Sequence, residues 1–397
     1  MTAWSGHRGA ARCLAGLGIA TALSTGVAVQ GAGAAEKQPK AGVIAVDGPM
    51  TGDQASTGTD MAKGAQLAVD QINAAGGVDG VKLTLVKVND KATAGAGLAA
   101  ARKAIAAHAF AVVGPYNSAV GVVNLPVYKR AGLPIVRLTS SVKTEGFGVT
   151  TQPMDTQVAP VELNEITSVL HATRPAIIYD TSTFTAGVAN QVKAGLAKAG
   201  TPAVAFIPVK ESATNFTSAV AKAAAAHPDL LYISAYGVDA GKIAREASTM
   251  NTGKCFVEGL AAQGPDFVSN ATQPVASACI SSGVPTAQQF VGASQYVSAY
   301  QSMFHMAPGT WGTYTYDSVE ILANAIKQAG WHQKAVATAL NQTSNYSGIT
   351  GPITIAPKTG NRVQSTVVVL DINSAGNYVI DPMWAAATGF PLPPTGS

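Results

Sequence analysis

Residues 112–141 read VVGPYNSAVGVVNLPVYKRAGLPIVRLTSS, and the order of patterns in this stretch decides the fold. The apolar run at residues 110–113 predicts a short strand that ends in a Gly-Pro turn. Apolar residues then recur at helical spacing from Val120 to Val127, and residues 135–138 form a second apolar run. A strand, a helix and a second strand in this order predict a parallel pair with a helical crossover.

Small hydroxyl residues follow both predicted strands. Ser118 follows the first strand, and Thr139, Ser140 and Ser141 follow the second. Ligands of an open parallel sheet bind outside the carboxyl ends of its strands, where a helix N-terminus favours a carboxylate or phosphate. These residues therefore suit an anion site. An alternative remains open, in which Ser118 only caps the helix and residues 139–141 only form a turn.

The rest of the chain repeats the alternation of strand and helix in two series, the first beginning at residue 42 and the second at residue 177. This alternation predicts an α/β fold of two similar lobes with doubly wound parallel sheets. Residues 287–306 are expected to be one long helical region. Residues 351–355 and 363–371 alternate like two paired strands joined by a turn.

The N-terminus has the pattern of a secretory signal peptide, expected over residues 1–35. Arg8 and Arg12 precede an apolar segment at residues 14–29, and GAGAA at 31–35 offers small residues for cleavage. Export to the periplasm is the expected location. No later segment is long and apolar enough to predict a membrane span.

Charge and cysteine content narrow the possible partners and cofactors. Removing residues 1–35 lowers the formal net charge from +4 to +2, which argues against nucleic acid as a partner. Cys255 and Cys279 are then the remaining cysteines, and in an oxidising compartment they most simply form one disulfide. The six histidines are scattered without metal-ligand spacing, so neither a metal nor a cofactor is expected.

No catalytic motif stands out along the chain. Neither a Gly-x-Ser-x-Gly elbow nor a phosphate-binding loop is present, and no His can be assigned to Ser118 as a base from the sequence. A binding protein without enzyme activity is the expected class. An exported hydrolase that uses Ser118 remains the competing class.

Several motifs lie along the chain: PMTG at 49–52, GAQLAVDQINAAGGVDG at 64–80, VGPYNS at 113–118, NF at 215–216 before PD at 228–229, and YDSVEILANAI at 316–326. In this order and spacing, they make the chain from about residue 41 to 380 resemble the leucine/isoleucine/valine-binding family of type I periplasmic binding proteins, the solute receptors of ABC importers.

The resemblance implies two lobes joined by three crossovers, with the ligand in the cleft between them. It implies a first lobe of residues 41–155 and 284–361, and a second lobe of residues 156–283 and 362–385. Residues 386–397 are expected to be a disordered tail. The implied partners are a small-molecule ligand and the permease subunits of an ABC importer in the inner membrane.

The resemblance also implies a set of ligand-binding residues in both lobes. In the first lobe, Ser118 matches a serine that holds the ligand carboxylate, and Thr139 and Ser141 match a contact set at the next strand end. In the second lobe, Phe184 stands where a tyrosine is usual, Tyr236 matches an aromatic contact, and Glu258 matches the acid that pairs with the ligand ammonium. The implied ligand is a branched-chain or other hydrophobic amino acid; an aromatic or other small carboxylate or amide is the alternative.

Overall fold

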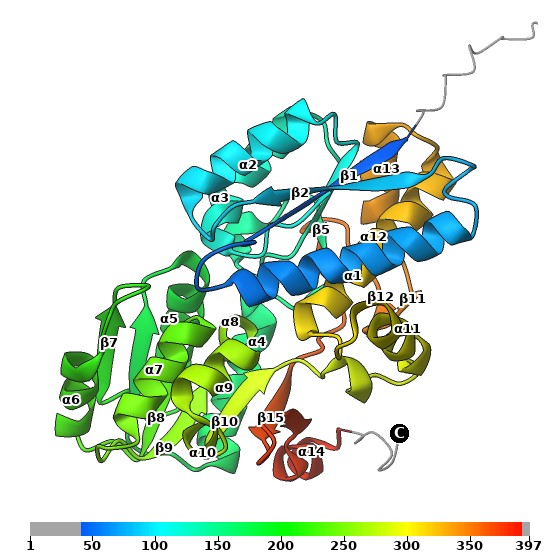
Figure 1. The fold of residues 1–397 in the computed structure, drawn as a ribbon. Helices are drawn as coiled ribbons and strands as arrows, with labels where there is room; N and C mark the ends of the chain where they lie inside the picture. Colours follow the sequence, from blue (N-terminus) through cyan, green and yellow to red (C-terminus); the bar gives the residue numbers. More distant parts are fainter. Residues whose placement is uncertain (1–40, 391–397) are drawn as a thin grey trace, which may run out of the picture. The chain divides into compact units, whose positions relative to one another are not determined.

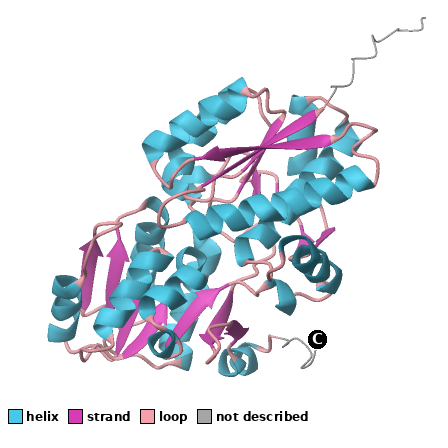
Figure 2. Ribbon diagram, in the orientation of Figure 1, coloured by secondary structure: helices cyan, strands magenta, loops and turns pink. Residues whose placement is uncertain are grey.

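The computed structural model describes residues 41–390 and contains a first sheet whose strands are all parallel (Figures 1 and 2). The strand order is β2-β1-β3-β4-β5. Its strands are β1 (Gly42–Gly48), β2 (Leu83–Asn89), β3 (Ala111–Val113), β4 (Ile135–Arg137) and β5 (Val149–Thr150). The helices that follow them are α1 (Ala55–Ala74), α2 (Ala94–Ala106) and α3 (Ser118–Arg130), with a 3₁₀ turn at Val142–Thr144.

A second sheet has the strand order β16-β15-β10-β9-β8-β6-β7. It is parallel from β7 to β10, whereas β15 runs antiparallel to β10 and β16 antiparallel to β15. Its strands are β6 (Pro175–Asp180), β7 (Ala205–Val209), β8 (Leu230–Ser234), β9 (Lys254–Val257), β10 (Cys279–Gly283), β15 (Val368–Ile372) and β16 (Tyr378–Ile380).

The helices of this second part lie between its strands or flank them (Figure 1). They are α4 (Asp155–Asn164) with a π-helical extension at Glu165–Val169, α5 (Thr183–Lys198), α6 (Thr217–Ala225), α7 (Gly237–Ala247), α8 (Gly259–Ala262), α9 (Pro265–Ala271), α10 (Gln273–Ala276) and α14 (Pro382–Thr388). The expected α/β fold with parallel sheets is confirmed.

The chain passes between the two sheets three times, after β5, after β10 and after β14. The segment that returns after β10 contains a 3₁₀ turn at Ala287–Gln289, α11 (Ser294–Phe304), α12 (Thr310–Ala329) and α13 (Gln333–Asn341). Helix α12 packs on α1, where Gly64 and Gly312 meet so closely that a Cβ on Gly64 would lie 1.9 Å from the Gly312 carbonyl oxygen. The expected lobe boundaries agree with this path and stay a prediction.

The prediction that residues 351–355 and 363–371 form two strands paired with each other was wrong. The structure has two short hairpins, β11 (Tyr346–Gly348) with β12 (Gly351–Ile353) and β13 (Ile355–Ala356) with β14 (Asn361–Arg362). Residues 363–371 do not form one strand because the chain crosses to the second sheet there, where β15 pairs with β10 and β16. The expected helix over 287–306 is also divided, with Gly292 at a positive φ of 83° before α11.

Apolar strands covered on both faces form the core. All residues of β3 and β8 are buried, as is typical of parallel sheets whose two faces carry helices. Neighbouring strands β9 and β10 are joined by the disulfide Cys255–Cys279, with a Cα–Cα distance of 4.6 Å. The expected disulfide is confirmed.

Two predictions concern the ends of the chain. The signal peptide expected at residues 1–35 lies outside the described residues, as do residues 391–397 of the expected tail. Residues 386–388 of that tail belong to helix α14, so this part of the prediction was wrong; Trp384 is buried and anchors the helix. Within residues 41–390, no helix combines the length and apolar character that crossing a membrane requires.

Candidate functional site

A small cavity brings together residues from both sheets and their helices. In the first part of the chain, which contains the first sheet, the lining residues are Tyr116, Ser118, Ser140 and Gln152. In the second part, which contains the second sheet, they are Phe184, Tyr236 and Leu260. The cavity volume is about 10 Å³, which is roughly the space of one water molecule. A ligand larger than water therefore requires side chains that line the cavity to move.

Ser118 is the first residue of helix α3, at the carboxyl end of β3. Its side chain is 1% exposed, and its Oγ accepts a hydrogen bond from the Ser141 N–H at 3.2 Å. The N-cap residue is Asn117, which makes no side-chain cap and instead donates from Nδ2 to Gln54 Oε1 at 2.8 Å. Ser118 is therefore not the N-cap of α3, and its contact with a ligand stays a prediction.

The hydroxyl residues after β4 divide into two groups. Ser140 lines the cavity, although the resemblance selected its neighbours Thr139 and Ser141. Thr139 Oγ1 donates to Thr144 Oγ1 at 2.7 Å, and Ser141 Oγ accepts from the Lys143 N–H at 3.4 Å. Because these two side chains hold the turn at Val142–Thr144, their direct contact with a ligand stays a prediction.

Arg137 is unusual in an apolar strand and is completely buried. Its guanidinium donates to the Thr139 carbonyl oxygen at 3.1 Å and to Asn361 Oδ1 at 2.5 Å. Burial lowers the pKa of Arg137 to about 10, so the side chain stays cationic at neutral pH. It holds the end of β4 in place and does not line the cavity.

The sequence analysis did not select two cavity residues from the first part of the chain, Tyr116 and Gln152. Tyr116 precedes α3, and its hydroxyl donates to the Leu260 carbonyl oxygen at 2.5 Å. Its ring centroid lies 5.1 Å from that of Trp311 and 6.2 Å from that of Tyr236. Gln152 lies two residues after β5, so the strand-end rule that selected Ser118 also applies to it.

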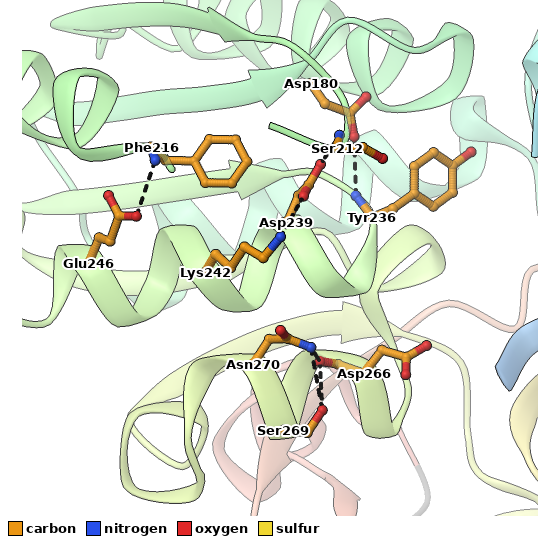
Figure 3. Close-up of polar contacts among 10 residues, drawn as sticks. All are labelled: Asp180, Ser212, Phe216, Tyr236, Asp239, Lys242, Glu246, Asp266, Ser269 and Asn270. Carbon is orange, nitrogen blue, oxygen red and sulfur yellow. Dashed lines mark hydrogen bonds and ion pairs between the residues drawn. The ribbon is translucent and has the colours of Figure 1, made fainter. Parts of the chain in front are cut away.

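Phe184 and Tyr236, from the second part of the chain, form an aromatic wall of the cavity. Phe184 lies in the first turn of α5 and is 4% exposed. Tyr236 is the N-cap residue of α7, and its N–H donates to Asp180 Oδ2 at 3.1 Å (Figure 3). The structure thus brings these two predicted residues to the same cavity as Ser118.

Glu258 does not line the cavity but caps helix α8. Its Oε1 accepts from the Leu260 N–H at 2.9 Å and its Oε2 from the Ala261 N–H at 3.0 Å. Burial raises the pKa of the Glu258 carboxyl well above its ordinary value, and the neighbouring Glu162 raises it further. Its expected pairing with a ligand ammonium stays a prediction.

An acidic group lies around Tyr236 and contains Asp180, Glu211 and Asp239. Asp239 Oδ2 accepts from the Ser212 N–H at 2.6 Å, and its Oδ1 lies 3.8 Å from Lys242 Nζ (Figure 3). Burial, followed by the charges of Asp180, Asp239 and Asp53, raises the pKa of Glu211 to about 7. The Glu211 carboxyl is therefore partly protonated near neutral pH.

The N-terminus of α1 and the residue before it contact acidic side chains of the second part of the chain. Gln54 Nε2 donates to Glu211 Oε1 at 3.4 Å, and the Ser56 hydroxyl donates to the Asp266 carboxylate. Together with the bond from Tyr116 to Leu260, these contacts connect the two parts of the chain around the cavity. Among the described residues, no three His, Cys, Asp or Glu side chains gather closely enough to hold a metal ion.

Comparison with known proteins identifies the family. The family model for periplasmic binding proteins matches residues 43–377. The chain belongs to this family of periplasmic binding proteins. Within it, the relatives and solved structures described next support the type I fold and the leucine/isoleucine/valine-binding group, whose members are solute-binding proteins.

Curated relatives of this periplasmic binding protein extend over most of its length. An amino acid binding protein of Pseudomonas aeruginosa is 28% identical over 312 residues, which cover 74% of this chain and 80% of that protein. A Leu/Ile/Val-binding protein homolog of Brucella abortus is 24% identical over 326 residues, covering 80% of this chain and 86% of that protein.

Solved structures share the fold of this periplasmic binding protein. The branched-chain amino acid binding protein LivJ of Streptococcus pneumoniae, in complex with isoleucine, has a TM-score of 0.77 at 25% identity and covers 85% of this chain and 98% of that chain. A solute-binding protein of R. palustris in complex with benzoate has a TM-score of 0.77 at 17% identity, covering 86% and 95%. The same fold therefore holds ligands of two chemical classes.

Proposed function

We propose that this protein is the exported receptor of an ABC importer and that it binds a small amino acid with a hydrophobic side chain in the cavity between its two sheets. The observation that carries the proposal is the arrangement of the cavity itself. A hydroxyl at a helix N-terminus faces an aromatic and aliphatic wall, formed by Phe184, Tyr236 and Leu260. The two sides suit the two ends of such a ligand.

The polar end of the ligand is the carboxylate. Helix α3 begins at Ser118 and is 13 residues long, so its first N–H groups and its dipole favour an anion there. The Ser118 oxygen accepts from the Ser141 N–H, which leaves its own O–H to donate to a carboxylate oxygen. Hydrogen bonds to a charged group contribute about 1.5–3 kcal/mol each, and several of them support micromolar affinity.

The hydrogen-bond partner of Ser118 supports a role in binding without catalysis. The group hydrogen-bonded to its Oγ is a backbone N–H, which cannot take up a proton as the base of a nucleophilic serine must. Contacts from both parts of the chain let the ligand stabilise a closed form, and an importer permease can then distinguish the loaded receptor from the empty one.

A benzoate-like carboxylate is the second candidate. The aromatic wall suits a phenyl ring, and a neighbour with this fold is in complex with benzoate. Both candidate ligands use the same hydrogen-bond donors of the protein for their carboxylate. They differ because an amino acid also carries an ammonium group, which needs a hydrogen-bond acceptor on the protein.

A thermal-shift screen tests the proposal. The protein without residues 1–35 is heated with each of the common amino acids, with aromatic carboxylates and with small amides. A rise in Tm with leucine, isoleucine, valine or phenylalanine that saturates with concentration supports an amino-acid receptor. A rise with benzoates alone would move the assignment to aromatic acids, and no rise with any class would contradict a receptor for either.

A further inference from the structure

Gln152 has a buried side-chain oxygen without a hydrogen-bond donor. The residue follows β5, is 2% exposed and lines the cavity. Its Nε2 donates to the Leu138 carbonyl oxygen and, at 2.8 Å, to Ser140 Oγ. Its Oε1 has no hydrogen-bond partner within residues 41–390, although almost all buried polar groups of folded proteins have one.

The orientation of the Gln152 amide follows from its neighbours. A backbone carbonyl can only accept hydrogen bonds, so the amide nitrogen must face Leu138 and the amide oxygen must point away from it. Turning the amide over would place two acceptor oxygens against each other. The unpaired atom is therefore an acceptor.

Ser140 reinforces this acceptor character. Its hydroxyl donates to the Pro153 carbonyl oxygen at 2.7 Å and accepts from Gln152 Nε2, so its proton is already used. Ser118 has the opposite character, because its oxygen accepts from the Ser141 N–H and its O–H remains available. Ser118, with this donor, and Gln152, with this acceptor, both line the same small cavity.

Glu258 is the other candidate to accept a hydrogen bond from the ligand, but its carboxylate already caps a helix. Both carboxyl oxygens of Glu258 accept hydrogen bonds from helix α8, and the residue lies outside the lining of the cavity. Among the residues that line the cavity, Gln152 has a buried side-chain oxygen without a hydrogen-bond donor.

From this geometry we infer that Gln152 Oε1 accepts a hydrogen bond from a donor on the ligand next to its carboxylate, an ammonium or a hydroxyl, and thereby selects against carboxylates that lack one. The inference rests on the proposed carboxylate site at Ser118. A ligand without this donor would enter the cavity and leave the Gln152 oxygen buried and unpaired, which weakens its binding.

Matched ligands that differ only in the group beside the carboxylate test this assignment. Calorimetry compares leucine with 2-hydroxy-4-methylpentanoate and 4-methylpentanoate, and phenylalanine with phenyllactate and 3-phenylpropionate. We expect the wild-type protein to bind the amino or hydroxy acid at least about tenfold more tightly than its donor-free partner. Equal affinity within both sets would overturn the inference and leave the carboxylate receptor intact.

Two variants with different expected effects test whether Gln152 is responsible for the preference. Gln152→Met keeps the side-chain length but removes the amide acceptor, so the ratio between the affinities for the donor-bearing and the donor-free acid should fall towards one. Ser118→Ala should weaken all members of a set by a similar factor and keep the preference. Because the readout is a ratio measured on one folded sample, a general loss of stability cancels.

Other outcomes would reject the assignment. A preference that survives in Gln152→Met and disappears in Glu258→Gln would place the acceptor at Glu258. Saturable binding of no member in either set would contradict the proposed function and the inference together.

Discussion

The Tyr116 hydroxyl donates to the Leu260 carbonyl oxygen at 2.5 Å, and this hydrogen bond joins the N-terminal end of α3 to helix α8 across the cavity. Both residues line the cavity, and Tyr116 also packs against Trp311 and Tyr236. The bond exists only when the two parts of the chain are close together. Under the proposed function, it therefore belongs to the closed form.

Tyr116→Phe removes this bond and keeps the ring. Because the bond is available only after closure, we expect ligand affinity to fall by about 0.5–1.5 kcal/mol, mainly through faster dissociation. Stopped-flow and calorimetric titration measure both quantities. Tyr179→Phe is the matched control, because its ring stacks on Phe206 at 4.3 Å, outside the cavity lining. Unchanged dissociation in Tyr116→Phe would show that the bond does not contribute to closure.

Glu211 makes the stability of the protein depend on pH. Burial raises the pKa of this carboxyl from 4.5 to about 7, so the folded protein favours its protonated form. Its contribution to stability is complete below pH 4.5 and is lost as the pH rises through about 7. We expect Tm to fall between pH 5 and pH 8, and to fall less in Glu211→Gln.

Asp70→Asn provides the control for this measurement, since Asp70 is an exposed carboxylate on α1. Its pH profile should match that of the wild type. If Glu211→Gln loses as much stability as the wild type over the same range, other buried carboxyls, such as Glu162 with a pKa of about 7, account for the fall.

The disulfide predicts the absence of free thiol in the protein without its first 35 residues. Titration of the unfolded, unreduced protein with a thiol reagent should find none, because Cys255 and Cys279 are bonded. The double change Cys255→Ser with Cys279→Ser should lower the unfolding free energy by about 3 kcal/mol, since it opens a loop of this length in the unfolded chain. Two reactive thiols per chain would contradict the bond.

Ser118→Ala tests the carboxylate contact. The change should weaken binding of every carboxylate ligand by about 1–3 kcal/mol, because it removes the O–H donor at the start of α3. It also leaves the Ser141 N–H without its acceptor, so a small fall in Tm is expected. Unchanged affinity would show that the anion site lies elsewhere.

Much of this architecture was predictable from periodicity and strand ends. Alternating strands and helices predicted the parallel sheets, and the strand-end rule selected Ser118, which lines the cavity with Phe184 and Tyr236. The hairpins within 346–362 were not predictable in this way, because their pairing depends on where the chain crosses between sheets. Local alternation carries no information on that crossing.

The remaining cavity residues depend on contacts between distant segments. Tyr116 reaches Leu260, which lies 144 positions later, and no local pattern encodes that approach. Thr139 and Ser141 were preferred to Ser140 by resemblance, yet the turn at Val142–Thr144 engages their side chains and leaves Ser140 at the cavity. Glu258 was predicted by resemblance, and its place at a strand end equally suits the cap of a following helix.

Calorimetric titration of the wild-type protein with leucine, isoleucine, valine and phenylalanine tests the central claim most directly. The proposal predicts saturable binding of at least one of them, with one ligand per chain and micromolar or tighter affinity, and recovery of the ligand unchanged. Absence of binding by all four, together with tight binding of benzoate, would contradict an amino-acid receptor.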